Sequence, residues 1–325
     1  MKKVELHVHF DGSIRVESIS KILGLPLDKV KEHMVVSDKV QNLDNYLGLF
    51  KFPLALMQNE KYLKKFAREL AVDLIADDVI YAEVRFAPLK HTRGGLSINE
   101  VIETVLDGFK KVKNIKINLI LCMMRESSIE DNLKIVRAAK KYRHQGVVAL
   151  DLAGNESLGS LRNYKILFEK AKEWKIPFTI HAGEVTDAQC VKEAIMIGAQ
   201  RIGHGIKAIE DEETIKLLKE KKVILELCPT SNVDTRAINK YKNHPIKDFL
   251  RKGVLITINT DNRTVSNITL EKEYAKLSEV FGFGRTEFRV LNLLAIKYSF
   301  LSVEEKLSLM KKMSDRYDNG EIKKQ

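Results

Sequence analysis

The sequence predicts an α/β fold, a (β/α)8 TIM barrel that forms a single domain over residues 1–325. Three observations lead to this prediction. Short runs of apolar residues recur eight times along the chain. Most of these runs are continuously apolar, which is typical of parallel strands that are covered on both faces. From the second run on, their starts lie 22 to 38 residues apart, and each gap holds an amphipathic helical pattern.

The eight candidate strands are rich in β-branched and apolar residues. In chain order they span 3–10, 79–88, 117–126, 147–154, 177–184, 201–206, 223–232 and 254–262. Helical patterns such as "NLKIVRAAKKYRHQG" and "NYKILFEKAKEWK" lie between them. A strand, a crossover helix and the next strand, repeated around a closed sheet, make this barrel.

The gap after the first strand is far longer than the others, at about 70 residues, and carries several helical patterns. Barrel enzymes build their active sites from loops at the carboxyl ends of the strands, so this helical insertion is a candidate lid. For its segment 46–58 we favour ordinary core packing. The alternative is an apolar pocket wall formed by Leu47, Phe50 and Phe52. After residue 262 the chain is expected to be helical, with a fraying polar tail, "DNGEIKKQ".

Composition argues against several classes of protein. The net charge is +11, but the lysines are scattered among glutamates, which favours solvated helix faces over a nucleic-acid partner. No apolar run approaches the roughly 18 residues of a membrane span, so we expect a soluble cytoplasmic protein with no membrane partner. The three cysteines are far apart and form no CxxC pair, which argues against disulfides and against a cysteine zinc site.

Unusual polar residues gather at the carboxyl ends of the predicted strands. His7 and His9 lie two residues apart on the first strand, so their side chains face the same way. His181 ends the fifth strand, His204 lies in the sixth and Asp261 ends the eighth. Polar residues at this end of a barrel are typical of catalysis. For the remaining histidines we expect no role in chemistry: His33, His91, His144 and His244.

Three imidazoles and one carboxylate at a barrel mouth favour zinc or a similar divalent ion. An isolated HxH pair is more often a polar strand face than a metal site. Here His181 and Asp261 make the metal site the favoured interpretation. Four protein ligands would leave a fifth position for water, which the metal would convert to hydroxide near neutral pH. The fourth strand, "VVALDLAG", contains no lysine to bridge two ions, so we expect one metal.

Glu184 follows His181 by three residues, where a turn can bring its carboxylate over a metal-bound water. A carboxyl group in a dry pocket can accept and return a proton, which is general acid/base catalysis. The alternative is a helix N-terminal glutamate. His204 can orient the same water, or it can be purely structural. Gly154 brings a bare backbone N–H to the rim of the fourth strand, although a glycine also simply ends strands.

The motifs "ELHVHFDGS", "YAEVRFAP", "DLAGNE", "HAGE", "RIGHGI", "LELCPTSN" and "NTD" occur in this order along the barrel strands. Together they make the chain resemble the adenosine deaminases of the metal-dependent amidohydrolase superfamily. The resemblance implies one zinc ion, a purine nucleoside as the partner, and hydrolysis of adenosine and 2′-deoxyadenosine to the inosine products and ammonia. The implied zinc ligands are His7, His9, His181 and Asp261.

The resemblance also implies roles around the substrate. Glu184 would protonate purine N1 while metal-bound hydroxide attacks C6, and His204 would hold and polarise that hydroxide. The substrate-binding residues would be His9, Asp11, Gly154 and Asn262. Of these, the Gly154 amide would donate to purine N3 and Asp11 would bond the ribose 5′-hydroxyl.

Two residues bear on the substrate. The carboxylate of Asp11 would repel a 5′-phosphate, which favours the nucleoside over AMP, while the free base is disfavoured less firmly. Many adenosine deaminases carry "TDDP" after the last strand, with the second aspartate on purine N7, whereas this chain has Asn262 at that place. An asparagine amide donates to N7 without needing a proton, so the contact can survive.

Alternatives remain. The same metal site could deaminate adenine, AMP or a modified nucleoside, or the barrel could bind a nucleoside without turnover. A basic nucleic-acid-binding protein is the third alternative, which the lack of a concentrated basic stretch disfavours. The oligomeric state is left open, with a monomer allowed.

Overall fold

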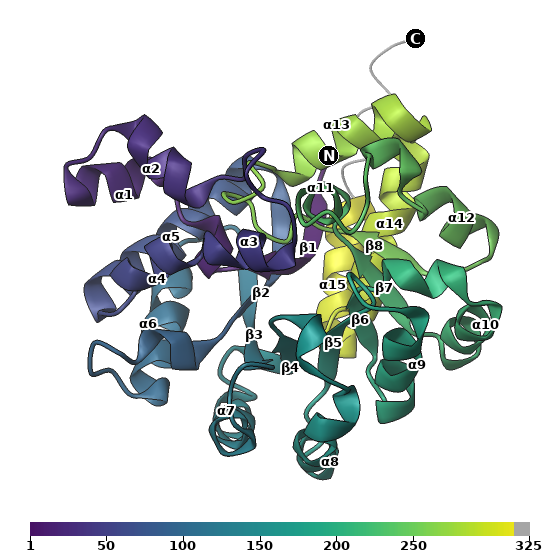
Figure 1. The fold of residues 1–325 in the computed structure, drawn as a ribbon, viewed down its shortest axis with the longest axis horizontal. Helices are drawn as coiled ribbons and strands as arrows, with labels where there is room; N and C mark the ends of the chain where they lie inside the picture. The colour runs from purple at the N-terminus through teal and green to yellow at the C-terminus, as the bar shows by residue number, and fades with distance from the viewer. Residues whose placement is uncertain (315–325) are drawn as a thin grey trace.

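Eight parallel strands follow one another around the centre of the molecule in chain order (Figure 1). The structure is a computed structural model that describes residues 1–314. All eight predicted strands are present and pair in parallel with their neighbours, so the predicted barrel is confirmed. The strands are β1 (Lys3–His9), β2 (Val79–Phe86), β3 (Lys116–Met124), β4 (Val147–Ala153), β5 (Phe178–Ala182), β6 (Arg201–His204), β7 (Ile224–Leu227) and β8 (Ile256–Ile258).

The barrel closes between its first and last strands at the mouth. Val8 and Asp261 form a parallel bridge. The Asp261 N–H donates to the His7 carbonyl over 2.9 Å, and the His9 N–H donates to the Asp261 carbonyl over 2.7 Å. This seam therefore brings residues from the two ends of the barrel sequence side by side.

The predicted insertion after β1 contains four short helices before the crossover helix α5 (Glu60–Ala76). In Figure 1 these purple and blue helices lie to one side of the barrel. The four helices are α1 (Val16–Leu23), α2 (Leu27–Met34), α3 (Leu43–Gly48) and α4 (Lys51–Leu56).

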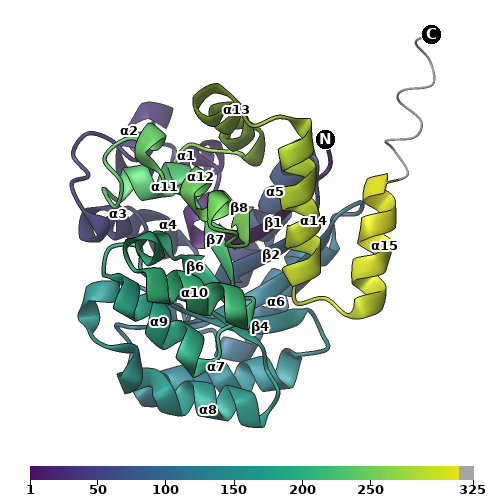
Figure 2. The same cartoon turned by 90° about the vertical axis from the view of Figure 1, so that its right-hand side faces the viewer.

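Helices also follow each later strand, and most of them cover the outside of the barrel, whereas the short helix after β7 lies at its mouth. They are α6 (Ile98–Lys110), α7 (Ile129–Tyr142), α8 (Lys165–Glu173), α9 (Ala188–Ile197), α10 (Glu212–Lys221), α11 (Pro229–Asp234) and α12 (Ile246–Arg251). The predicted helical end of the chain comprises α13 (Leu270–Phe281), α14 (Arg285–Tyr298) and α15 (Val303–Ser314), with α14 against both β1 and β8 (Figure 2). The predicted fraying tail, 318–325, lies outside the described residues.

One apolar core runs through the barrel and its helices, from Val8 to Leu291. Such a core explains why the strands are continuously apolar, since their side chains are buried between barrel interior and helix layer. Among residues 1–314, no helix is both long and apolar enough to span a membrane.

Some predicted strand ends were wrong. The run 223–232 was predicted as one strand, but β7 ends at Leu227 and α11 begins at Pro229. Proline is favoured in the first turn of a helix, where its missing N–H costs nothing. β6 ends at His204 and β8 ends before Asp261, and both residues have left-handed backbones, with φ of 62° and 61°.

Candidate active site

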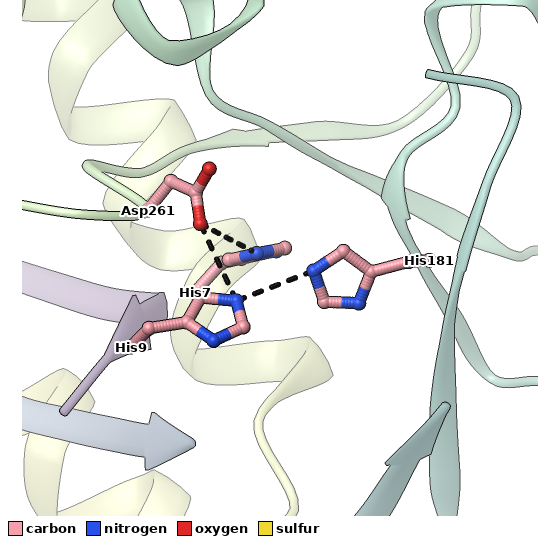
Figure 3. Close-up of side chains that lie close together, drawn as sticks. All are labelled: His7, His9, His181 and Asp261. Carbon is pink, nitrogen blue, oxygen red and sulfur yellow. Dashed lines mark hydrogen bonds and ion pairs between the residues drawn. The ribbon is translucent and has the colours of Figure 1, made fainter. Parts of the chain in front are cut away.

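Four potential metal ligands meet at the barrel mouth: His7, His9, His181 and Asp261 (Figure 3). His9 Nε2 lies 3.3 Å from both His181 Nε2 and Asp261 Oδ1, and His7 Nε2 lies 3.4 Å from Asp261 Oδ1. Donors 2.0–2.1 Å from one tetrahedral ion are roughly 3.3 Å apart, so the spacing fits an ion of the size of zinc. His7 Nε2 is buried and has no hydrogen-bond partner among residues 1–314, as expected of an atom meant for a ligand.

Buried carboxylates orient two of these imidazoles. His7 Nδ1 lies 2.9 Å from Glu226 Oε2, and His181 Nδ1 lies 2.9 Å from Asp151 Oδ2. Because an ionised carboxylate only accepts, each Nδ1 carries the hydrogen and each Nε2 turns its lone pair toward the shared point. His7 and His181 thus present the donor atoms that a metal ion requires.

A buried arginine joins the two supporting carboxylates. Arg85 donates to Asp151 over 3.0 Å and to Glu226 over 2.8 Å. Burial alone would raise the pKa of Glu226, but the charges of Arg85 and Arg201 outweigh it and hold that pKa well below its usual range. The carboxylates behind the histidines are therefore ionised and able to accept.

Burial also sets the charge of the candidate ligands. It lowers the pKa of His7 and that of His9, which favours the neutral form that binds a metal. Burial alone would raise the pKa of Asp261, but the imidazoles of His7 and His9 beside its carboxylate outweigh burial and hold that pKa well below its usual range. The pKa of His181 is raised instead, because the charge and hydrogen bond of Asp151 outweigh burial. Neutral His7 and His9 beside an ionised Asp261 are thus in the form that binds a divalent cation.

A second set of potential ligands, His204, Cys228 and Asp261, overlaps the first at Asp261. Burial raises the pKa of the Cys228 thiol well above its usual value, which disfavours the thiolate that metals bind. The first set therefore fits a metal better. As expected from their spacing, the three cysteines are free thiols.

Glu184 is buried beside the candidate metal ligands. Asn232 Nδ2 and Thr235 Oγ1 each donate to Glu184 Oε1 over 2.9 Å, and His204 Nε2 lies 3.6 Å from Glu184 Oε2. Burial raises the pKa of Glu184, and the His204 imidazole opposes this only in part. A carboxyl group with a raised pKa beside a pocket is suited to exchange a proton near neutral pH.

Glu156 holds the backbone that carries Glu184. Its carboxylate accepts from the N–H groups of Glu184, Val185 and Thr186 over 3.1–3.3 Å, and from Thr186 Oγ1 over 2.8 Å. The side chain is 3% exposed. This contact fixes the position of the Glu184 Cα relative to the loop after β4.

One pocket contains every predicted site residue except His7, which lies beneath it. Asp11, Gly154 and Asn262 line the pocket, and Gly154 has a φ of 96°, a conformation that favours glycine. Asp11 Oδ1 and Asn262 Oδ1 are buried without hydrogen-bond partners among residues 1–314. A Cβ on Gly12 would lie 2.0 Å from Asn262 Oδ1, so only glycine fits there.

The insertion supplies the apolar side of this pocket. Leu47 and Phe50 line it, together with Leu43, Tyr46 and Leu54. The pocket-wall alternative is thus confirmed for Leu47 and Phe50. It was wrong for Phe52, whose ring packs against the main core and stacks on His33 with centroids 5.2 Å apart.

Several residues of the site were missed by sequence reasoning. Asp151 and Glu226 are charged residues inside apolar strands, a signal that indicates a buried partner and could have been used. Glu156, Ser231 and Asn232 are polar residues in loops or short helices, and no such signal marks them.

Comparisons with known proteins agree with the fold and identify a family. A model of the family described as adenosine deaminase matches residues 2–316. The adenosine deaminase of Clostridium perfringens (strain SM101 / Type A) is 41% identical, with 95% of this chain and 97% of that protein covered. The adenosine deaminase of Clostridium botulinum (strain Okra / Type B1) is 43% identical, with 94% and 95% covered.

Among solved structures, the apo N6-methyl-AMP deaminase of Arabidopsis thaliana is similar, with a TM-score of 0.86 and 26% identity. The match covers 99% of this chain and 97% of that one. Since the family model and both curated relatives match along nearly the whole length, this chain belongs to the adenosine deaminase family.

Proposed function

We propose that the protein hydrolyses adenosine and 2′-deoxyadenosine to inosine and 2′-deoxyinosine, with release of ammonia. Water adds its oxygen to purine C6, and the bond from C6 to the amino nitrogen breaks. The observation that carries the proposal is the buried carboxyl of Glu184 beside four convergent metal ligands, in a chain more than 40% identical to named adenosine deaminases. A pure nucleoside-binding protein has no need of such a carboxyl group.

The proposed metal ligands are His7, His9, His181 and Asp261, and their nitrogen-rich set favours zinc. When bound, the ion would supply a hydroxide nucleophile near neutral pH. Ser231 Oγ donates to Asp261 Oδ2 over 2.6 Å, which leaves Oδ1 facing the histidines. We propose one ion per chain.

Glu184 is the proposed general acid/base. It would give a proton to purine N1, which concentrates the electron deficiency of the ring at C6, and it would move a proton to the departing amino group. Asn232 and Thr235 hold Oε1, so Oε2 is the oxygen left for this transfer. His204 would hold and polarise the hydroxide nucleophile.

The proposed substrate contacts place the nucleoside. The Gly154 N–H would donate to purine N3, the Asn262 amide to N7, and Asp11 would accept from the ribose 5′-hydroxyl. His9 reaches the pocket as well as the ligand group. Related chemistry on AMP, adenine or a modified nucleoside is the second candidate, because the similar Arabidopsis thaliana structure is named for N6-methyl-AMP.

The test is ammonia release from adenosine, 2′-deoxyadenosine, adenine and AMP in parallel, before and after chelation and return of zinc. We expect zinc-dependent release from the two nucleosides. Glu184→Gln should lower kcat by roughly 100-fold or more, because the general acid/base is lost. The exposed carboxylate Glu279 provides the control, Glu279→Gln, which should leave kcat unchanged. Turnover of adenosine by Glu184→Gln at the wild-type rate would refute the assignment.

A further inference from the structure

Asn232 lies between the two proposed catalytic side chains and contacts both. It is fully buried in α11, with its Nδ2 2.9 Å from Glu184 Oε1 and 3.0 Å from His204 Nδ1. On the other side, its Oδ1 lies 3.2 Å from His244 Nε2. An amide NH2 group has two hydrogens, and each of them has one acceptor here.

The orientation of this amide is fixed by Glu184. A carboxylate oxygen only accepts, and Glu184 Oε1 also receives the Thr235 hydroxyl hydrogen, so the amide turns its NH2 group toward it. The amide oxygen then faces His244, and His244 Nε2 carries the hydrogen that it accepts. Its Nδ1 is buried without a hydrogen-bond partner among residues 1–314, as suits the nitrogen that carries no hydrogen. A flipped amide would turn oxygen toward the carboxyl group and NH2 toward a donor.

This orientation decides which nitrogen of His204 carries the hydrogen. Since Asn232 donates to Nδ1, that nitrogen is an acceptor, and the hydrogen of the neutral ring is on Nε2. Nε2 is the nitrogen that faces Glu184 Oε2, 3.6 Å away, at the pocket. We propose that Asn232 is a positioning residue that fixes His204 as the Nε2–H tautomer and, with the same amide, holds the Glu184 carboxyl group.

His244 then helps to orient Asn232, although the sequence predicted no role in chemistry for this histidine. His244 donates to Asn232, and Asn232 donates to both His204 and Glu184, so one chain of hydrogen bonds sets the two groups together. Its value for catalysis depends on the proposed deamination, but the tautomer itself does not. The proposed deaminase activity and the proposed tautomer of His204 can therefore be refuted separately.

The test reads the tautomer directly. Protein labelled with 15N-histidine and supplied with zinc gives two-bond 1H–15N correlations that separate Nε2–H from Nδ1–H rings, and His204→Gln assigns the signal by its loss. We expect Nε2–H in the wild type. Asn232→Asp puts an acceptor where the donor stood, and should move the His204 hydrogen to Nδ1.

A matched substitution separates positioning from general loss of packing. Asn292 is also a buried asparagine, 1% exposed, and it donates to Tyr274 and Phe288 away from the pocket. Asn232→Ser should lower kcat roughly 10- to 100-fold with a smaller change in KM, as outer partners of active-site histidines do, whereas Asn292→Ser should leave both the His204 signal and kcat unchanged.

A wild-type His204 ring protonated on Nδ1 would overturn the proposal, and this measurement needs no variant to fold. So would a His204 signal that is the same in Asn232→Asp and Asn232→Ser as in the wild type. Wild-type protein that shows the Nε2–H ring but releases no ammonia from adenosine would refute the proposed function and leave the tautomer assignment standing.

Discussion

Two residues of opposite charge face the same pocket. Asp11 and Lys90 both line it. Burial raises the pKa of Asp11 to about 6, although backbone N–H groups and the charge of Lys90 oppose the shift. Asp11 is therefore ionised at neutral pH and can accept from a ribose hydroxyl. A phosphate at the same place would meet a carboxylate with little water between them, and Lys90 offsets only part of that repulsion.

Removal of this carboxylate charge should change substrate preference. Asp11→Asn should raise the ratio of kcat/KM for AMP to that for adenosine by roughly tenfold, because the repulsion of the phosphate is lost. The ratio is measured from ammonia release on both substrates. Asp28→Asn, at an exposed position in α2, is the control and should keep the wild-type ratio. If the ratio is unchanged in Asp11→Asn, another residue excludes the phosphate.

Glu273 is a buried carboxyl group that does not line the pocket. Tyr241 donates to it over 2.6 Å, and burial raises its pKa to about 7. Because this folded-state pKa is above the unfolded value, the stabilising proton is fully bound below about pH 4.5 and is lost as the pH rises through 7. The charge left behind in the core then destabilises the folded state.

Glu273→Gln removes this titration. Relative to the wild type, its free energy of unfolding should rise by about 2.5 kcal/mol between pH 5 and pH 8. Urea unfolding at the two pH values measures the difference. Glu279→Gln, on the same helix but exposed, should follow the wild type at both. An equal pH dependence in Glu273→Gln and the wild type would contradict the prediction.

At the scale of elements, the apolar wall of the pocket is tied to the loop after β8. Tyr46, in α3, shares a hydrogen bond of 2.8 Å with Ser266, and Val36 donates its N–H to the Val265 carbonyl over 2.8 Å. Ser231 reaches toward the Tyr46 hydroxyl over 3.5 Å while it donates to Asp261. The placement of α3 over the pocket is thus coupled to Ser231, which supports the proposed metal ligand Asp261.

Loss of one hydroxyl should loosen this wall. Tyr46→Phe removes a buried hydrogen bond worth about 1 kcal/mol, so KM for adenosine should rise roughly fivefold with a smaller change in kcat. Steady-state kinetics measure both constants. Tyr274→Phe removes a buried hydroxyl that accepts from Asn292, and it should leave KM unchanged. The same KM in Tyr46→Phe and the wild type would show that the hydroxyl does not hold the wall.

The strands could be predicted from sequence because burial on both faces leaves long apolar runs. The candidate ligands could be placed at the barrel mouth because they lie at the ends of those runs. The short helix α11 could not be predicted from sequence. Its "PTSN" letters continue an apolar strand, and only the proline marks a new element. Asn232 was missed for this reason, since its place beside Glu184 depends on that helical turn. Phe52 was misplaced because five of the six residues of α4 are apolar, so the sequence does not show which of them meet the pocket.

At the scale of the whole molecule, the proposed metal ligands come from the first strand, the fifth strand and the end of the last. A bound ion would thus join segments more than 170 residues apart in the chain, at the seam where the barrel closes. Since unfolding separates these ligands, the ion stabilises only the folded form.

Zinc should therefore raise the melting temperature. At a free zinc concentration 100 times Kd, the gain is about 2.7 kcal/mol, or roughly 5 °C. Thermal unfolding of chelated protein with and without added zinc measures it. His181→Ala should show a much smaller rise and retain less zinc. An equal rise in the melting temperature of the wild type and of His181→Ala would show that the ion binds at another site.

The close approach of Gly12 to Asn262 constrains how this barrel can be redesigned or can diverge. The two residues come from the turns after β1 and β8, and no side-chain atom fits between them. Exchanges of equal size, such as Asn262→Asp, keep the turn intact, whereas a larger side chain at either position would push the first turn of the chain away from the last. Because Gly12 cannot become smaller, a library at position 262 is confined to side chains no larger than asparagine, and a library at position 12 would sample mostly misfolded barrels.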